Sequence, residues 1–149
     1  MALPAVSIVI PTLNAGQFLG DALNSIVIQT FTDYEILICD GGSTDRTLEI
    51  AAAVPRTRVV RQQDIGLAGA WNDGIRAAAG KYICFLDSDD LWASDCLENH
   101  MAGFGTDIGF WGSIGHVEFF LEEDQIAPPG FKMSLLEGNY PAYMPGCFM

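Results

Sequence analysis

Short apolar runs alternate with amphipathic stretches over the first ninety residues of this 149-residue chain. The runs are bounded by Pro, Gly or Asp and are too short for helices, which predicts buried strands at residues 6–10, 34–39, 58–61 and 82–86. Between them, apolar residues recur at helical spacing, most clearly from Leu67 to Ala78. This strand–helix alternation predicts a parallel α/β sheet with right-handed crossovers.

Polar residues indicate where the first two helices begin. Asn14, followed by Gln17 three positions later, is typical of a capping box. Ser43 or Thr44 can cap the second helix, and Asp45 is favourable in its first turn. We therefore expect the first helix to follow Asn14 and the second to run to about residue 53.

The regular alternation ends after residue 90. A short helix from Ser94 to about His100 and a weakly alternating strand at residues 116–120 are predicted there, and glycines interrupt the remainder. We expect one domain over residues 1–149, in which residues 1–100 form one half and residues 101–149 begin a second, incomplete half. The chain ends within sequence that is expected to be structured, which favours a piece of a longer protein.

The chain is strongly acidic and yet mostly apolar. Its formal net charge is -12, and 50% of its residues are hydrophobic while 17% are charged. This balance excludes a disordered chain. Because no basic stripe is present, neither nucleic acid nor an anionic membrane surface is expected as a partner. A nucleotide diphosphate would be repelled unless a divalent cation lay between the two anions.

Neither a signal peptide nor a membrane span is evident. Residues 1–4 lack a charged start, and no apolar run approaches the roughly 18 residues that cross a bilayer. The cysteines at 39, 84, 96 and 147 form no C-x-x-C pair and are expected to be reduced thiols rather than disulfides or zinc ligands. We expect a cytoplasmic segment, which a longer parent chain could anchor elsewhere.

Carboxylates follow three of the predicted strands. Asp40 comes directly after the second strand, Asp64 lies in the loop after the third, and Asp87 and Asp89 follow the fourth. Open α/β sheets bind ligands at the carboxyl ends of their strands, so these acids should converge on one crevice. Two carboxylates at a spacing of two can share one hard cation. A plain turn is the alternative for Asp87-Ser88-Asp89, but the position after the fourth strand favours a metal site.

The segment Asp40-Gly41-Gly42-Ser43 joins a strand to a helix. Its glycines allow a ligand to approach the backbone closely, and the helix start would offer free N–H groups. The segment is neither a G-x-G-x-x-G fingerprint nor a P-loop. Asp40 can either accept a hydrogen bond from a base or ribose or close an Asx turn, and the sequence leaves both roles open.

Four segments match, in order, the motifs of one family. They are residues 6–14 (VSIVIPTLN), 40–45 (DGGSTD), 64–80 (DIG, AWNDGI and AG) and 85–90 (FLDSDD). They resemble glycosyltransferase family 2, whose GT-A fold is a Rossmann-like, mostly parallel sheet flanked by helices. The resemblance covers about residues 5–100. It implies an inverting, metal-dependent enzyme that moves a sugar from a nucleotide diphosphate, commonly a UDP-sugar, to an acceptor hydroxyl in polysaccharide or glycoconjugate synthesis.

The resemblance also implies which residues bind the donor. They are Pro11, Thr12, Asn14, Asp40, Asp64, Asp87 and Asp89. Pro11, Thr12 and Asn14 would line the nucleoside pocket, Asp40 would bind the base, and Asp64 would help to hold the nucleoside. Asp89 would ligate Mn²⁺ or Mg²⁺, and Asp87 would contact the ribose or the hydrated metal. The acceptor would be an unidentified carbohydrate or lipid-linked molecule.

Neighbouring residues are expected to be structural. Asn72 and Asp73 lie off the apolar stripe of the third helix, which favours a solvated helix face, and Trp71 and Trp92 are expected in the core. The family takes its catalytic base from a later segment, expected here beyond Met149. Where the family usually has a His-Gln pair, this chain has PGC at residues 145–147.

Two other functions compete with a transferase. The same fold can serve as a non-catalytic nucleotide-sugar-binding module, but the Asp87-x-Asp89 pair favours an enzyme. A nucleotidyltransferase would carry a basic, Gly-rich loop after the first strand, whereas residues 11–16 contain no Lys or Arg. Aromatic residues beyond residue 100 would be partly uncovered in an incomplete domain, so self-association is also expected.

Overall fold

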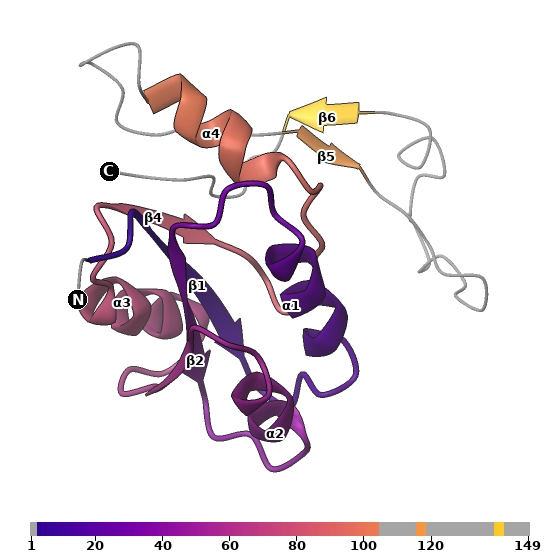
Figure 1. Cartoon of the computed structure of the whole chain (residues 1–149). Coiled ribbons are helices and arrows are strands. Elements are labelled where there is room, and N and C mark those ends of the chain that lie inside the picture. The colour runs from indigo at the N-terminus through magenta and orange to yellow at the C-terminus, as the bar shows by residue number, and fades with distance from the viewer. Residues whose placement is uncertain (1–2, 105–115, 119–138, 142–149) are drawn as a thin grey trace.

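The computed structural model describes residues 3–104, 116–118 and 139–141. Four parallel strands form a sheet in the order β3-β2-β1-β4 (Figure 1), which confirms the predicted α/β architecture. The strands of this sheet are β1 (Val6–Thr12), β2 (Tyr34–Asp40), β3 (Thr57–Arg61) and β4 (Tyr82–Phe85). The helices are α1 (Leu19–Val27), α2 (Thr47–Ala52), α3 (Leu67–Ala77) and α4 (Cys96–Phe104). A separate antiparallel pair consists of β5 (His116–Glu118) and β6 (Asn139–Pro141).

The helices cover both faces of the sheet, as Figure 1 shows for α1 and α2 on one face and α3 on the other. Side chains alternate along a strand, so Ile8 and Ile10 of β1 join the apolar cluster with α1, while Val9 joins the cluster with Ala70 of α3. Every residue of β1 is buried. Because both faces of the strand are covered, most of its side chains are apolar, and Ser7 is the exception within residues 6–11.

A glycine allows α3 to lie directly on the sheet. A Cβ atom at Gly74 would lie only 2.3 Å from Cγ1 of Val9 and 3.0 Å from Sγ of Cys39. The backbone of α3 therefore packs directly against side chains of β1 and β2, with no room for a methyl group between them.

Hydrogen bonds lock the edge of the sheet where β1 and β4 begin. The hydroxyl of Ser7, fully buried, donates to Glu35 at 2.7 Å and accepts from the Gly80 N–H at 2.9 Å. Glu35 also accepts the Ala79 N–H at 2.8 Å. These bonds fix the turn between α3 and β4 to the starts of β1 and β2, at the edge opposite the loops described below.

The starts of α1 and α2 differ from the sequence predictions. Asn14 does not cap α1, which begins at Leu19 after a turn and has no side-chain cap. The second helix begins at Thr47, and neither Ser43 nor Thr44 caps it. Instead, Asp45 accepts hydrogen bonds from the N–H and the hydroxyl of Thr47, at 3.0 and 2.5 Å. The polar residues before both helices are engaged in contacts between loops, which local spacing does not reveal.

Cysteine chemistry follows the prediction in part. Cys39 and Cys96 are free, and burial raises the pKa of each thiol to about 11. Within residues 3–104, 116–118 and 139–141, no helix is long and apolar enough to span a membrane.

Candidate functional site

The loops that follow the strands lie together at the carboxyl edge of the sheet. The chain passes from β1 to β2 to β3 in one direction and then returns to place β4 on the other side of β1. In open α/β sheets, the crevice at such a reversal of strand order is where ligands bind. The residues singled out in the sequence all lie in these loops or at the ends of these strands.

A cavity of about 420 Å³ opens at this edge. It is lined by the end of β1, the start of the loop after β2, and the loop that joins β3 to α3. The lining residues are Pro11, Thr12, Leu13, Gly41, Gln62, Gln63, Asp64, Ile65, Gly66, Leu67 and Ala70. Of the residues predicted to bind the donor, Pro11, Thr12 and Asp64 are in this lining. A volume of several hundred cubic ångströms is typical of a small-molecule site.

Asp40 closes the loop after β2. Its carboxylate, 5% exposed, accepts the N–H groups of Gly42 and Ser43 at 2.9 and 3.0 Å through one oxygen. The other oxygen accepts the hydroxyls of Ser43 at 2.5 Å and of Thr12 at 3.3 Å. This is the Asx-turn alternative, extended to β1. Gly42 has a φ of 98°, a left-handed conformation that favours glycine.

Asn14 holds the same loop from the side of β1. Its N–H donates to the Ser43 hydroxyl at 2.9 Å, and its side-chain oxygen accepts the Thr44 N–H at 2.9 Å. Asn14 adopts a φ of 52°, which Asn tolerates better than most residues. Asp40 and Asn14 thus position the glycine loop beside the cavity.

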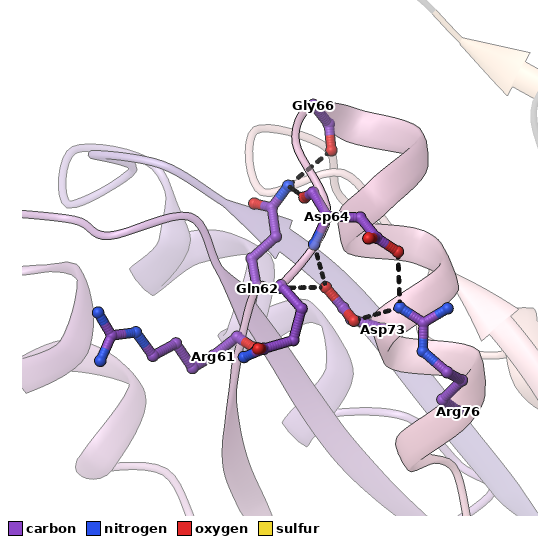
Figure 2. A network of polar contacts seen from close by, with 7 residues as sticks. Arg61, Gln62, Asp64, Gly66, Asp73 and Arg76 are labelled. Atoms are coloured by element: carbon purple, nitrogen blue, oxygen red, sulfur yellow. Dashed lines mark hydrogen bonds and ion pairs between the residues drawn. The ribbon is translucent and has the colours of Figure 1, made fainter.

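The loop between β3 and α3 is held by a second polar network, shown in Figure 2. The Gln62 side-chain amide donates to the carbonyl oxygens of Asp64 and Gly66 at 2.5 and 2.7 Å. Asp73 accepts the N–H groups of Gln63 and Asp64 at 2.6 and 3.4 Å. The backbone between β3 and α3 is therefore fastened on two sides.

A single arginine nitrogen joins two carboxylates in this network. Nη2 of Arg76 donates to Asp73 at 2.5 Å and to Asp64 at 2.9 Å. The N–H of Gln63 is the main cause that lowers the pKa of Asp73, and Arg76 adds to it. Asp64 contributes to the cavity wall while its carboxylate lies against Arg76 (Figure 2).

The acids after β4 form a turn, in which the Asp90 N–H donates to the Asp87 carbonyl at 3.1 Å. Desolvation raises the pKa of Asp87, and the charge of Asp89 adds to that rise. The pKa of Asp90 is also raised, and desolvation is again the largest cause. Among the described residues, no Lys or Arg forms an ion pair with these acids, and no group of three or more His, Cys, Asp or Glu is arranged to hold a metal.

Sequence reasoning missed two parts of this site. Asp73 was expected on a solvated helix face, but its side chain is only 4% exposed and supports the neighbouring loop. Gly69 permits that loop to lie against α3, because a Cβ atom there would be 2.4 Å from the Asp64 carbonyl oxygen. The spacing of Gly69, Asp73 and Arg76, four and then three residues apart, marks one helix face and was the available signal. Trp71 and Trp92 pack at the edges of the apolar clusters, as expected.

Comparison with known proteins decides the family. The model of the family described as Glycosyl transferase family 2 matches residues 7–132. The chain belongs to glycosyltransferase family 2. A chondroitin synthase of Escherichia coli is 40% identical over 109 residues, which cover 70% of this chain and 16% of that protein. A PGL/p-HBAD biosynthesis glycosyltransferase of Mycobacterium bovis is 41% identical over 111 residues, 70% of this chain and 43% of that protein.

Solved structures of glycosyltransferases share the fold. Staphylococcus aureus TarS (residues 1–349, in complex with UDP) superposes with a TM-score of 0.66 at 23% identity, covering 83% of this chain and 38% of that one. The mannosyltransferase PcManGT of Pyrobaculum calidifontis, in complex with GDP-Man and Mn²⁺, gives a TM-score of 0.66 at 26% identity, covering 80% and 37%. The family 2 chain thus has the GT-A fold, and it spans well under half the length of these relatives.

Proposed function

We propose that this family 2 chain binds a nucleotide-sugar donor, UDP-linked in preference to other nucleotides, for inverting transfer of the sugar to an acceptor hydroxyl. The cavity at the carboxyl ends of β1 to β3 is the observation that carries the proposal. Its size suits a nucleoside, and it lies at the strand-order reversal where α/β sheets bind ligands. Residues 1–100 would form the nucleotide-sugar-binding half.

Each predicted donor residue has a place in this proposal. Pro11 and Thr12 would form the floor of the nucleoside pocket, and Asp64 would accept a hydrogen bond from the nucleoside. Asp40 and Asn14 would act by holding the glycine loop, whose Gly41 lines the cavity. The loop would present its backbone to the ligand because Gly41 has no side chain.

The turn after β4 would hold a divalent cation, Mn²⁺ or Mg²⁺. Carboxylate oxygens are suitable ligands for both ions, and Asp89 and Asp87 supply them with no competing ion pair among the described residues. Two carboxylates do not complete a coordination shell, so phosphate oxygens and water would supply the rest. The structure of PcManGT is of a complex with GDP-Man and Mn²⁺, which supports a divalent metal in the proposal. The cation would neutralise charge on the departing diphosphate.

Transfer would break the bond between the anomeric carbon and the diphosphate oxygen. The acceptor oxygen would form the new bond from the opposite face, which inverts the anomeric centre, and its proton would pass to a general base. The residues described here would bind and orient the donor. Asp87 and Asp89 are proposed as metal ligands, and neither is proposed as the base.

Calorimetry with nucleotides tests the donor proposal. We expect UDP to bind more tightly than ADP, and only when Mn²⁺ or Mg²⁺ is present, because the chain carries a net charge of -12. Titration of each nucleotide with metal and with chelator measures both effects. UDP binding of equal strength in chelator would contradict the metal bridge, and equal affinity for ADP would contradict the base preference.

A further inference from the structure

The loop at residues 62–67 forms one wall of the cavity, and part of its support comes from two residues that do not line it. Asp73 binds the backbone of Gln63 and Asp64, and Arg76 binds the carboxylates of Asp73 and Asp64 (Figure 2). Asp73 and Arg76 lie one helical turn apart on α3. The shape of this wall therefore depends on a charged pair on the helix behind it.

We propose that Asp73 and Arg76 are positioning residues for the nucleoside side of the cavity, a proposal that rests on the function proposed above. Arg76 occupies Oδ2 of Asp64. Oδ1 of Asp64 has no hydrogen-bond partner among the described residues, and it is the oxygen left to accept from a ribose hydroxyl or a base N–H. Arg76 thus determines which oxygen of Asp64 is offered to the ligand.

The negative charges of Asp64 and Asp73 explain why a positively charged side chain is needed at position 76. Asp64 and Asp73 both approach the same nitrogen, so without Arg76 two carboxylates would face each other and repel. Asp73 is buried and fixed by backbone N–H groups, whereas the side chain of Asp64 is 60% exposed. The repulsion would therefore move Asp64, the residue of the cavity wall.

Substitutions at Arg76 separate positioning from simple packing. Both contacts come from one nitrogen, so Arg76→Lys can replace them with one ammonium group, whereas Arg76→Gln removes the charge. We expect Arg76→Gln to weaken UDP binding about twofold to fivefold in the presence of Mn²⁺, the range for an exposed ion pair, and Arg76→Lys to restore most of it. Arg46→Gln is the matched control, because Arg46, directly before α2, pairs with Glu49 at the same spacing and neither residue lines the cavity.

Asp73→Asn tests the other half of the pair. The Asn carbonyl can still accept the two backbone N–H groups, but its amide would face Arg76 as a second donor. We expect this variant to bind UDP like Arg76→Gln, with its thermal unfolding close to that of the unsubstituted chain. UDP affinities that are the same for Arg76→Gln, Arg76→Lys and the unsubstituted chain would overturn the proposal.

Amide hydrogen exchange provides a readout that needs no nucleotide. Asp73→Ala removes the acceptor of the Gln63 and Asp64 N–H groups, so exchange across residues 62–66 should become faster while exchange in β1 and β2 stays unchanged. Unchanged exchange in this loop would also overturn the proposal. If the unsubstituted chain binds no nucleotide, the proposed function fails, and the exchange result still decides whether Asp73 positions the loop.

Discussion

Replacing Asp40 by Asn should preserve most of the bonds that close the loop after β2, whereas replacing it by Ala removes all of them. One oxygen of Asp40 accepts two backbone N–H groups, from Gly42 and Ser43, and the carbonyl oxygen of Asn can accept both. The other oxygen accepts two hydroxyls, from Ser43 and Thr12. Hydroxyls can rotate and accept from the Asn amide instead, so both hydroxyl oxygens keep a hydrogen-bond partner.

The magnitude follows from which groups lose their partners. In Asp40→Ala the N–H groups of Gly42 and Ser43 can turn to water, but the hydroxyl of Thr12 belongs to a residue that is only 4% exposed. Leaving a buried polar group without a partner costs about 1–3 kcal/mol, and the loop also loses its bonds to a charged acceptor. We expect the free energy of unfolding to fall by about 2–3 kcal/mol for Ala and by less than about 1 kcal/mol for Asn. The corresponding decreases in Tm are about 4–12 °C and less than about 4 °C.

Urea unfolding followed by circular dichroism measures this difference, and UDP titration with Mn²⁺ on the same variants measures its effect on the proposed site. If Asn and Ala lower the stability equally, the reasoning is refuted, because the negative charge of Asp40, rather than its hydrogen bonds, would then hold the loop. Full stability of Asp40→Ala would refute it from the other direction. If both variants fold and only Ala loses UDP binding, Asp40 acts on the ligand through the loop.

Three further experiments test other parts of the structure. Gly74→Ala forces a methyl group against Val9 and should lower the free energy of unfolding by about 1–3 kcal/mol in thermal or urea unfolding. Gly20→Ala on α1 is the control: an added Cβ there would meet no packing neighbour within 4 Å, so it should not destabilise the chain. Asp89→Ala should abolish metal-dependent UDP binding in calorimetry and leave the Tm unchanged; a collapsed Tm would instead identify Asp89 as a structural residue of the turn. Burial raises the pKa of the Cys39 thiol to about 11, so its thiolate is scarce below that pH, and alkylation by iodoacetamide at about pH 8 should be much slower than in the urea-unfolded chain when followed by mass spectrometry.

The sheet and its helices could be predicted because buried strands and helices require apolar residues at regular positions in the sequence. Strands buried on both faces appear as short apolar runs, and α3 repeats its apolar residues at helical spacing. The edge of the sheet that carries the site followed from the same alternation, since parallel strands end together. Asp64 in the loop after β3 was expected at this edge on that ground, and Pro11 and Thr12 at the end of β1 were expected there from the family resemblance; all three line the cavity.

The contacts between loops could not be predicted from local patterns. The spacing of Asn14 and Gln17 matches a capping box, yet Asn14 bonds to Ser43 and Thr44, about thirty residues further along the chain. Asp73 lies off the apolar stripe of α3, so the helical periodicity indicates only that this position is polar. Its burial arises because the loop after β3 folds over it, and that approach depends on the missing side chain of Gly69. The helical spacing of Gly69, Asp73 and Arg76 places them on one face but does not show what covers that face.

The hydrogen bonds of Ser7, Glu35 and Gly80 affect which parts of this domain can vary without a loss of stability. They fasten the starts of the strands to one another through side chains that take no part in the cavity at the far edge. A strand of seven residues such as β1 separates the two edges by about 20 Å. Because distant sites contribute to stability almost independently, substitutions in the cavity loops leave this foundation intact. We therefore expect substitutions that change only the cavity lining to leave the bonds at the opposite edge unchanged.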